Sequence, residues 1–131
     1  MREGEGFTLL ELLVVVGIIG ILSAIAIPQF SEYRSRGFDA RARSDLRKIA
    51  LAEDAYFVQH NRFVACGPTL NGDECNMLPE IKNISPGTML EIKVSEDGAS
   101  FTGTARHNEG TGVTCRWDSL AGGMLGCKQV D

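Results

Sequence analysis

The stretch Gly6-Phe7-Thr8-Leu9-Leu10-Glu11, continued by an apolar run that ends at Ala26-Ile27-Pro28, decides the fold of this chain. Residues 7–27 are apolar except at Thr8, Glu11, Gly17, Gly20 and Ser23. At about 1.5 Å per residue, a helix of this length extends roughly 30 Å, the thickness of the hydrocarbon core of a bilayer. A carboxylate at the centre of a bilayer costs roughly 2.5–3.5 kcal/mol. Glu11 therefore needs a functional explanation.

Charge is distributed unevenly along the 131 residues, whose formal net charge is −4. Residues 33–48 carry two acids, Asp39 and Asp45, and six basic side chains: Arg34, Arg36, Arg41, Arg43, Arg47 and Lys48. Residues 49–131 carry six basic and eleven acidic side chains, which leaves that part at −5. We interpret the first part as a basic collar on a solvated helix face and the second as an acidic head.

Four cysteines lie beyond the apolar run: Cys66, Cys75, Cys115 and Cys127. None belongs to a C-x-x-C pair, and the spacings of nine and twelve residues disfavour a zinc site. We therefore expect two disulfides and an oxidising compartment. Three connectivities are open, and we favour Cys66–Cys75 with Cys115–Cys127, because each pair brackets a turn-rich segment.

Two general interpretations of the N-terminal stretch meet difficulties. A secretory signal would explain Ala24-Ile25-Ala26 as a cleavage site, but the apolar run is too long and Glu3 and Glu5 stand where positive charge is expected. A plain membrane anchor would place the basic collar in the cytoplasm by the positive-inside rule. That orientation conflicts with the disulfides and leaves Glu11 unexplained.

The stretch resembles the class III leader and N-terminal helix of type IV pilins and pseudopilins. The resemblance rests on Gly6-Phe7-Thr8-Leu9-Leu10-Glu11 and on the end of the run at Pro28-Gln29-Phe30. It extends to about residue 63 through Tyr33, residues 44–47 and Ala55-Tyr56-Phe57. The leader departs from the family in one respect, because Met1-Arg2-Glu3-Gly4-Glu5-Gly6 is less basic than usual.

The resemblance implies roles for five residues. A prepilin peptidase would cut after Gly6, and Phe7 would become the N-methylated first residue. In an assembling filament the carboxylate of Glu11 would pair with the ammonium group of Phe7 on an adjacent subunit, which fixes the register. The helix would loosen between Gly20 and Pro28 in the filament, since proline removes an N–H and glycine adds backbone freedom.

These features predict an α+β fold in four parts. They are a leader at 1–6, a transmembrane and filament-core helix at 7–28, its amphipathic continuation at 29–62, and a β-rich head at 63–131. The continuation has a predicted apolar face made of Ala42, Leu46, Ile49, Ala52 and Tyr56. The side chains expected on the opposite, solvated face are Arg41, Arg43, Arg47, Lys48, Glu53 and Asp54.

The head is predicted to contain a small antiparallel sheet of three or four strands. Residues 63–86 are rich in turn signals and are expected to form a loop tied by Cys66 and Cys75. Strands are expected at 89–94, 99–106 and 113–117, with a short one at 124–128. Asp97-Gly98 predicts a hairpin turn, Phe101 a core position, and Trp117 a place under the loop between Cys115 and Cys127.

The sequence shows no catalytic constellation, and His60 and His107 are expected on the surface. We therefore expect no enzyme activity, cofactor or metal, and we assign no nucleic-acid partner. The resemblance implies a major pilin that polymerises into a type IV pilus for motility, adhesion or related uptake. The alternatives are a pseudopilin of type II secretion, or a minor pilin acting as an adhesin or DNA-uptake module.

The resemblance also implies partners and a location. The expected partners are copies of the same chain, the prepilin peptidase and the assembly platform of the inner membrane. The precursor is expected to be a single-pass inner-membrane protein with its head in the periplasm, and the mature chain is expected in the extracellular pilus.

Overall fold

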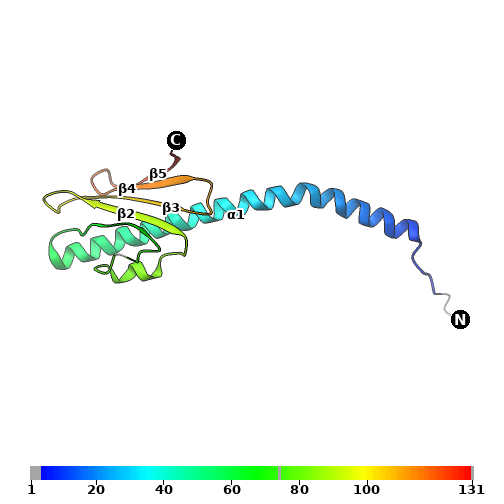
Figure 1. Cartoon of the computed structure of the whole chain (residues 1–131), viewed down its shortest axis with the longest axis horizontal. Coiled ribbons are helices and arrows are strands. Elements are labelled where there is room, and N and C mark those ends of the chain that lie inside the picture. The colour runs from blue at the N-terminus through cyan, green and yellow to red at the C-terminus, as the bar shows by residue number, and fades with distance from the viewer. Residues whose placement is uncertain (1–3, 74, 131) are drawn as a thin grey trace. The chain divides into compact units, whose positions relative to one another are not determined.

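The computed structural model describes residues 4–73 and 75–130, and it divides into two compact units, Met1–Arg34 and Ser35–Asp131. One helix, α1 (Leu9–His60), continues through both units (Figure 1). The other elements, all in the second unit, are β1 (Cys66–Leu70), the 3-10 helix η1 (Pro79–Asn83), β2 (Thr88–Val94), β3 (Phe101–His107), β4 (Val113–Asp118) and β5 (Gly123–Gln129). The predicted combination of a long helix and an antiparallel sheet is confirmed.

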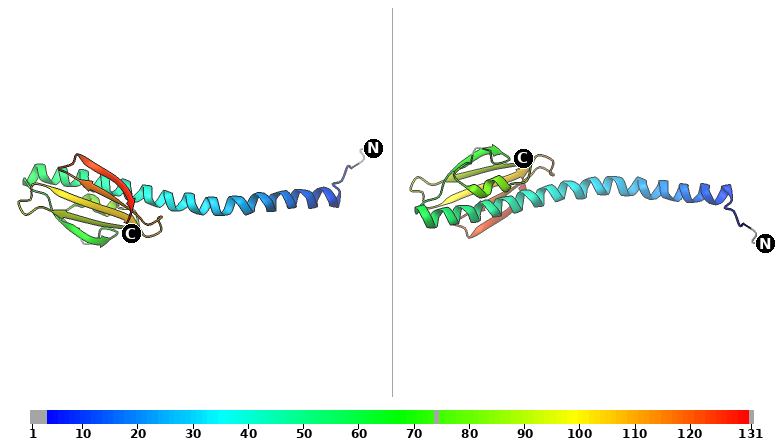
Figure 2. Two further views of the ribbon diagram at one scale, coloured as in Figure 1. Left: turned by 90° about the horizontal axis from the view of Figure 1, so that it is seen from above. Right: turned by 90° about the horizontal axis from the view of Figure 1, so that it is seen from below.

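In the second unit, five antiparallel strands follow one another in the order β1-β2-β3-β4-β5, and α1 covers one face of the sheet (Figure 2). The predicted count of three or four strands was too low. The additional strand is β1, which lies in the segment expected to be a loop. Its sequence, CGPTL, contains glycine and proline, and a proline is tolerated because β1 is an edge strand with an irregularity between Cys66 and Thr69.

The remaining strands lie where the alternating pattern predicts them, within one or two residues at each end. β2 and β3 pair from Thr88 opposite His107 to Val94 opposite Phe101. The predicted turn at Asp97-Gly98 joins them, and the amide of Ser95 donates to the carbonyl of Ser100 at 2.9 Å. Gly98 has a φ of 71°, which glycine adopts without the penalty that a Cβ would bring.

The core lies between α1 and the inner face of the sheet. The predicted apolar face of the helix is confirmed: Ala42, Leu46, Ile49 and Ala52 are buried, and Tyr56 packs partly against them. The sheet contributes the buried side chains of Leu90, Ile92 and the predicted Phe101. The single tryptophan, Trp117, also packs against this core and is partly buried.

Both disulfides have the connectivity that we favoured. Cys66 in β1 is bonded to Cys75, and Cys115 in β4 is bonded to Cys127 in β5. The second pair joins residues that face each other across the β4–β5 ladder. Each bridge therefore closes a local segment of the second unit.

Two surface assignments were wrong. Glu53 was expected on the solvated face of the helix but is completely buried, because it follows the buried Ile49 by one helical turn. His107 was expected on the surface but has only 4% of its area exposed. Its Nε2 lies 2.8 Å from the carbonyl of Pro86, and its ring stacks on Phe38 with centroids 4.4 Å apart. His60, by contrast, is exposed as expected.

Gly103, at an inward position of β3, permits the close approach of helix and sheet. A Cβ at this position would lie 2.8 Å from Cδ1 of Leu46 and 2.9 Å from Cδ1 of Ile92. We expect Gly103→Ala to lower the free energy of unfolding by about 1–3 kcal/mol, the usual cost of overpacking a core. Urea denaturation of the detergent-solubilised chain, followed by Trp117 fluorescence, measures this loss.

Thr102→Ser, an exposed position in the same strand, is the control for Gly103→Ala. It should change the free energy of unfolding by no more than about 0.5 kcal/mol. Equal losses in the two variants would contradict the close-packing explanation.

Candidate functional site: the helix start and the anchors of the head

The first turn of α1 is closed by a reciprocal pair of hydrogen bonds between Thr8 and Glu11. The amide of Thr8 donates to Oε2 of Glu11 at 2.9 Å, and the hydroxyl of Thr8 donates to the same oxygen at 3.1 Å. The amide of Glu11 in turn lies 3.2 Å from Oγ1 of Thr8. This arrangement is a capping box, which satisfies amides that a helix start leaves unpaired. Its signature, threonine followed three residues later by glutamate, was visible in the sequence but was not recognised there.

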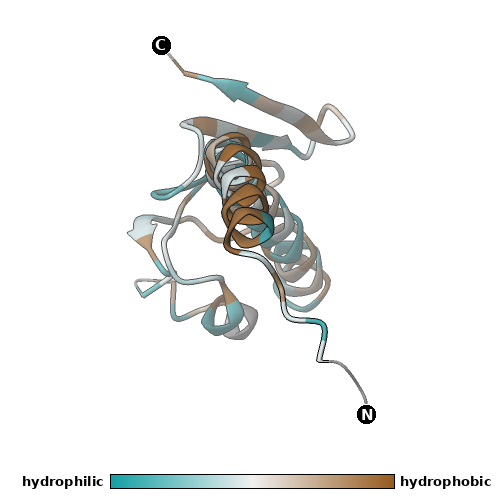
Figure 3. Cartoon of the chain, turned by 90° about the vertical axis from the view of Figure 1, so that its right-hand side faces the viewer, coloured by the Kyte–Doolittle hydropathy of each residue, from teal (hydrophilic) through white to brown (hydrophobic). Residues whose placement is uncertain are grey.

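The rest of the first unit is an apolar helix, and its described large hydrophobic side chains are exposed. The most apolar 18-residue window of α1, near the N-terminus, has a mean hydropathy of 2.7, and none of it is buried. Figure 3, seen from this end, shows mostly hydrophobic colour around the helix. By length and composition alone, the helix could cross a membrane.

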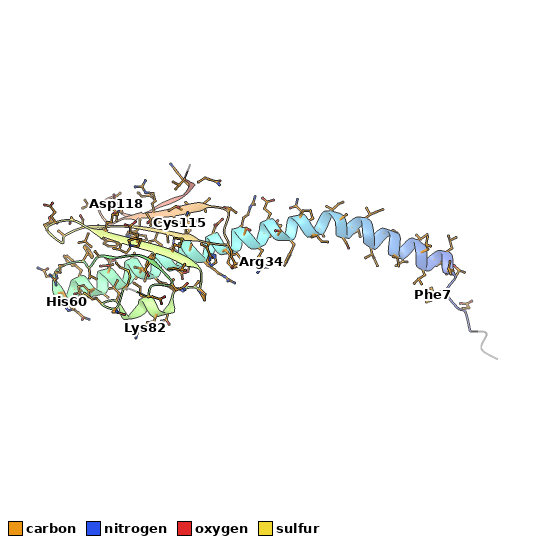
Figure 4. All side chains as sticks on the ribbon, in the orientation of Figure 1. Phe7, Arg34, His60, Lys82, Cys115 and Asp118 are labelled. Atoms are coloured by element: carbon orange, nitrogen blue, oxygen red, sulfur yellow. A yellow bond between two sulfur atoms is a disulfide. The ribbon has the colours of Figure 1, made fainter. Side chains whose placement is uncertain are left out.

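The structure places the residues predicted for processing and assembly along this unit. Gly6 and Phe7 precede the helix, and the ring of Phe7 is 92% exposed (Figure 4). Gly20 lies inside the helix with no atom near its missing Cβ, and Pro28 is accommodated without ending the helix. Within the single chain, the described partner of Glu11 is Thr8, not Phe7.

In the second unit, three acids on α1 each hold a different connection of the sheet. They are Asp39, Asp45 and Glu53, and each accepts a hydrogen bond from a backbone amide distant in sequence. Sequence reasoning missed all three as anchors. For Asp45 and Glu53, their positions on the apolar face of the helix were the available signal, because an acid on that face becomes buried and then requires donors from elsewhere in the fold.

Asp39 holds the turn between β3 and β4. Its Oδ1 accepts from the amide of Thr111 at 3.1 Å, and its Oδ2 accepts from the hydroxyl of Thr111 at 2.6 Å. Next to this contact, the amide of Glu109 donates to Nδ1 of His107. Because Nδ1 accepts, the proton of the neutral ring lies on Nε2, where it points to the carbonyl of Pro86.

Asp45 is completely buried and is surrounded by more donors than Asp39 or Glu53. Its Oδ2 accepts from the hydroxyl of Thr88 at 2.7 Å and from the amide of Ser85 at 3.1 Å. The hydroxyl of Ser85 lies 3.3 Å from Oδ1, and Nζ of Lys48 lies 3.5 Å from the same oxygen. These donors compensate for the removal of the carboxylate from water and fix the start of β2 on the helix.

Glu53 is the least compensated of the three. Its Oε2 accepts from the amide of Val64 at 3.0 Å, in the connection between α1 and β1. Its Oε1 is buried without a hydrogen-bond partner among the described residues. Burial raises the pKa of Glu53 to about 7; the Val64 hydrogen bond opposes this shift, and the nearby carboxylate of Asp54 adds to it.

The three acids connect α1 to other segments of the second unit. Within residues 4–73 and 75–130, no group of three or more His, Cys, Asp and Glu side chains could hold a metal ion. The three acids instead bind donors that the chain itself supplies.

Comparison with known proteins finds a match at the N-terminal end of the chain. Residues 1–27 match the family model described as "Prokaryotic N-terminal methylation motif". This is the motif of the stretch that contains Gly6, Phe7 and Glu11.

The chain is also similar to type IV pilins and fimbrial proteins. The chain is 43% identical over 61 residues to the type IV major pilin protein of Myxococcus xanthus, covering 47% of this chain and 28% of the relative. It is 42% identical over 65 residues to a fimbrial protein of Pseudomonas aeruginosa, covering 50% and 42%. The resemblance to type IV pilins is thereby confirmed. The matching segments span less than half the length of these two relatives.

A third relative is matched over more of its length. The major component of the type IV wide pilus of Thermus thermophilus is 28% identical over 111 residues, covering 85% of this chain and 79% of the relative. The similarity to pilins therefore extends beyond the N-terminal helix into the head.

Proposed function

We propose that this chain is the structural subunit, and specifically the major subunit, of a type IV pilus. The observation that carries the proposal is the combination of a methylation motif with an apolar helix whose described hydrophobic side chains are exposed. Such a surface needs a bilayer before assembly and neighbouring helices afterwards, since contiguous apolar patches of this size are not stable in water.

Processing would convert the N-terminus into an assembly element. Cleavage after Gly6 by a prepilin peptidase creates an ammonium group at Phe7, and methylation of that nitrogen preserves its charge. The exposed Phe7 and the carboxylate of Glu11 are then available to pair between adjacent subunits in the filament core. A charge pair inside an apolar core fixes register, because a misaligned subunit leaves a buried charge unpaired.

The other segments of the chain have functions that fit a pilus subunit. The helix at 7–28 anchors the precursor in the inner membrane, with the head of residues 63–131 in the periplasm, where its disulfides can form. The assembly platform of the inner membrane extracts the processed subunit, and loosening between Gly20 and Pro28 accommodates it in the filament. Twitching motility or adhesion would be the activity of the assembled pilus.

Mass spectrometry of surface filaments tests the proposal directly. The chain is expressed in a piliated bacterium whose own major pilin gene is deleted, and filaments are sheared from the cells. We expect a filament subunit that begins at N-methylated Phe7 and is four hydrogens lighter than the reduced chain, because two disulfides have formed. Filaments that lack this subunit, or a chain that remains unprocessed in the membrane, would contradict the proposal.

A further inference from the structure

Two hydrogen bonds join the connection between α1 and β1 (residues 61–65) to the helix. The amide of Asn61 donates to the carbonyl of Phe57 at 2.7 Å, and the second bond ends on a buried acid. The amide of Val64 donates to Glu53, which is completely buried while its second carboxylate oxygen has no described partner. A buried carboxyl group without full hydrogen bonding is tolerated far better when it is neutral than when it is charged. Protonation of Glu53 therefore favours its buried position, and with it the closed connection.

The same connection contributes a core aromatic residue. The ring of Phe63 lies 4.6 Å from the ring of Phe57 on α1 and 4.7 Å from that of Phe101 on β3, measured between centroids. The amide of Phe63 donates to the carbonyl of Gly98 at 3.0 Å. Release of the connection would withdraw Phe63 from this cluster and expose the end of the core.

Water already reaches the outer side of the connection. A surface hollow of about 370 Å³ lies between the connection and the β2–β3 hairpin, lined by Phe63, Val64 and Val94 among other residues. A local opening at Val64, the donor to Glu53, would therefore admit water from this hollow.

Few charges oppose or support ionisation of Glu53. The titratable groups described nearest to it are Asp54, Tyr56 and His60 on α1, Arg62 in the connection, Glu96 and Asp97 in the β2–β3 hairpin, Glu91 and Lys93 on β2, and Arg106 and His107 on β3. Of these, the carboxylate of Asp54 disfavours a second negative charge. His60 is exposed and stacks on Tyr56, Arg62 is exposed beside Gly98, and His107 is engaged by Phe38 and Pro86. No described cation therefore pairs with Glu53.

We propose that Glu53 is a pH-sensitive latch, which keeps the connection at residues 61–65 closed when protonated and releases it when ionised. The latch lies within the second unit, Ser35–Asp131. It goes beyond the proposed role in a pilus, because it needs no filament. It would make the helix end of the head looser in neutral or alkaline surroundings than in acidic ones.

Proton linkage gives the direction in which pH changes the opening of the connection. The pKa of Glu53 is about 7 in the folded chain and 4.5 in its ordinary solvated state, so the closed state binds more protons. The stabilisation by the latch is complete below pH 4.5 and is lost as the pH rises through 7. The two pKa values correspond to an increase of roughly 70-fold in the opening equilibrium between pH 5 and pH 8.

Hydrogen–deuterium exchange of the full chain in detergent micelles tests the latch without requiring filaments. Exchange of the amides of Phe63 and Val64 is measured at pH 5 and pH 8 and corrected for the intrinsic pH dependence of exchange. We expect the corrected opening equilibrium to rise between ten- and a hundredfold at the higher pH. The amide of Thr111, held by Asp39, serves as an internal control and should not change to this extent.

Two variants test whether ionisation of Glu53, and not of another group, causes the pH dependence of opening. Glu53→Gln keeps an acceptor for Val64 but cannot ionise, so its opening should be independent of pH. Asp54→Asn removes the neighbouring charge and should keep the pH dependence, with its midpoint shifted to lower pH. Equal opening of the native chain at pH 5 and pH 8, or a pH dependence that persists in Glu53→Gln, would overturn the proposal. If Glu53→Gln does not fold, the comparison within the native chain still decides.

Discussion

Glu11→Gln is expected to abolish pilus assembly while leaving the chain processed and inserted in the membrane. Glutamine can keep the hydrogen bond from the amide of Thr8, since capping boxes accept glutamine in place of glutamate. It cannot, however, pair with the ammonium group of Phe7. Breaking a buried charge pair costs about 3–5 kcal/mol, so we expect surface filaments to fall by at least ~100-fold. Electron microscopy and immunoblots of sheared filaments and membranes measure both outcomes.

Two further substitutions distinguish the charge from the helix cap. Glu11→Ala removes both functions and should also block assembly. Thr8→Ala removes the capping hydroxyl at a cost of about 1 kcal/mol but keeps the carboxylate, so filaments should still form. Normal piliation of Glu11→Gln together with loss of piliation in Thr8→Ala would show that Glu11 acts through the cap alone.

Asp45→Ala is expected to produce the largest loss of stability in the head. The substitution leaves the buried hydroxyl of Thr88 and the amide of Ser85 without their acceptor, and it also removes the partner of Lys48. Unsatisfied buried donors cost about 1–3 kcal/mol each. We therefore expect the free energy of unfolding to fall by about 3–5 kcal/mol in urea denaturation of the solubilised chain.

Asp39→Ala provides the matched control for Asp45→Ala. Asp39 also anchors a connection through a threonine, but its contacts with Thr111 are exposed to solvent, which can replace the lost acceptor. We expect a loss of about 1 kcal/mol. A loss at position 39 as large as that at position 45 would contradict the importance of burial.

Much of the fold could be predicted because local patterns and tertiary packing agree. The alternation of Leu90, Ile92 and Val94 marks a strand with one buried face, and the spacing of Ala42, Leu46 and Ile49 marks the buried side of the helix. The pairing of the cysteines follows from their spacing around turns. The stretch around Glu11 carries the resemblance to pilins by its sequence alone.

The remaining features depend on partners that lie far away in the sequence. Glu53 could not be assigned to the interior because its donor, Val64, lies beyond the end of the helix. His107 is buried because Phe38 stacks on it and Pro86 accepts from it, and neither contact is apparent from its own neighbours. β1 forms at the sheet edge because β2 offers a pairing partner, although the sequence of β1 has weak strand character.

The sequential order of the five strands has a consequence for how quickly the head can form. Each strand pairs with the one that precedes or follows it in the chain, so every pairing joins segments that are close in sequence. Topologies with such short-range pairing fold faster than those with long crossovers, because less loop-closure entropy is lost before contacts form. The disulfides link cysteines only 9 and 12 residues apart, so correct partners meet early. The head would thus spend little time with an unpaired strand edge that could pair with another chain.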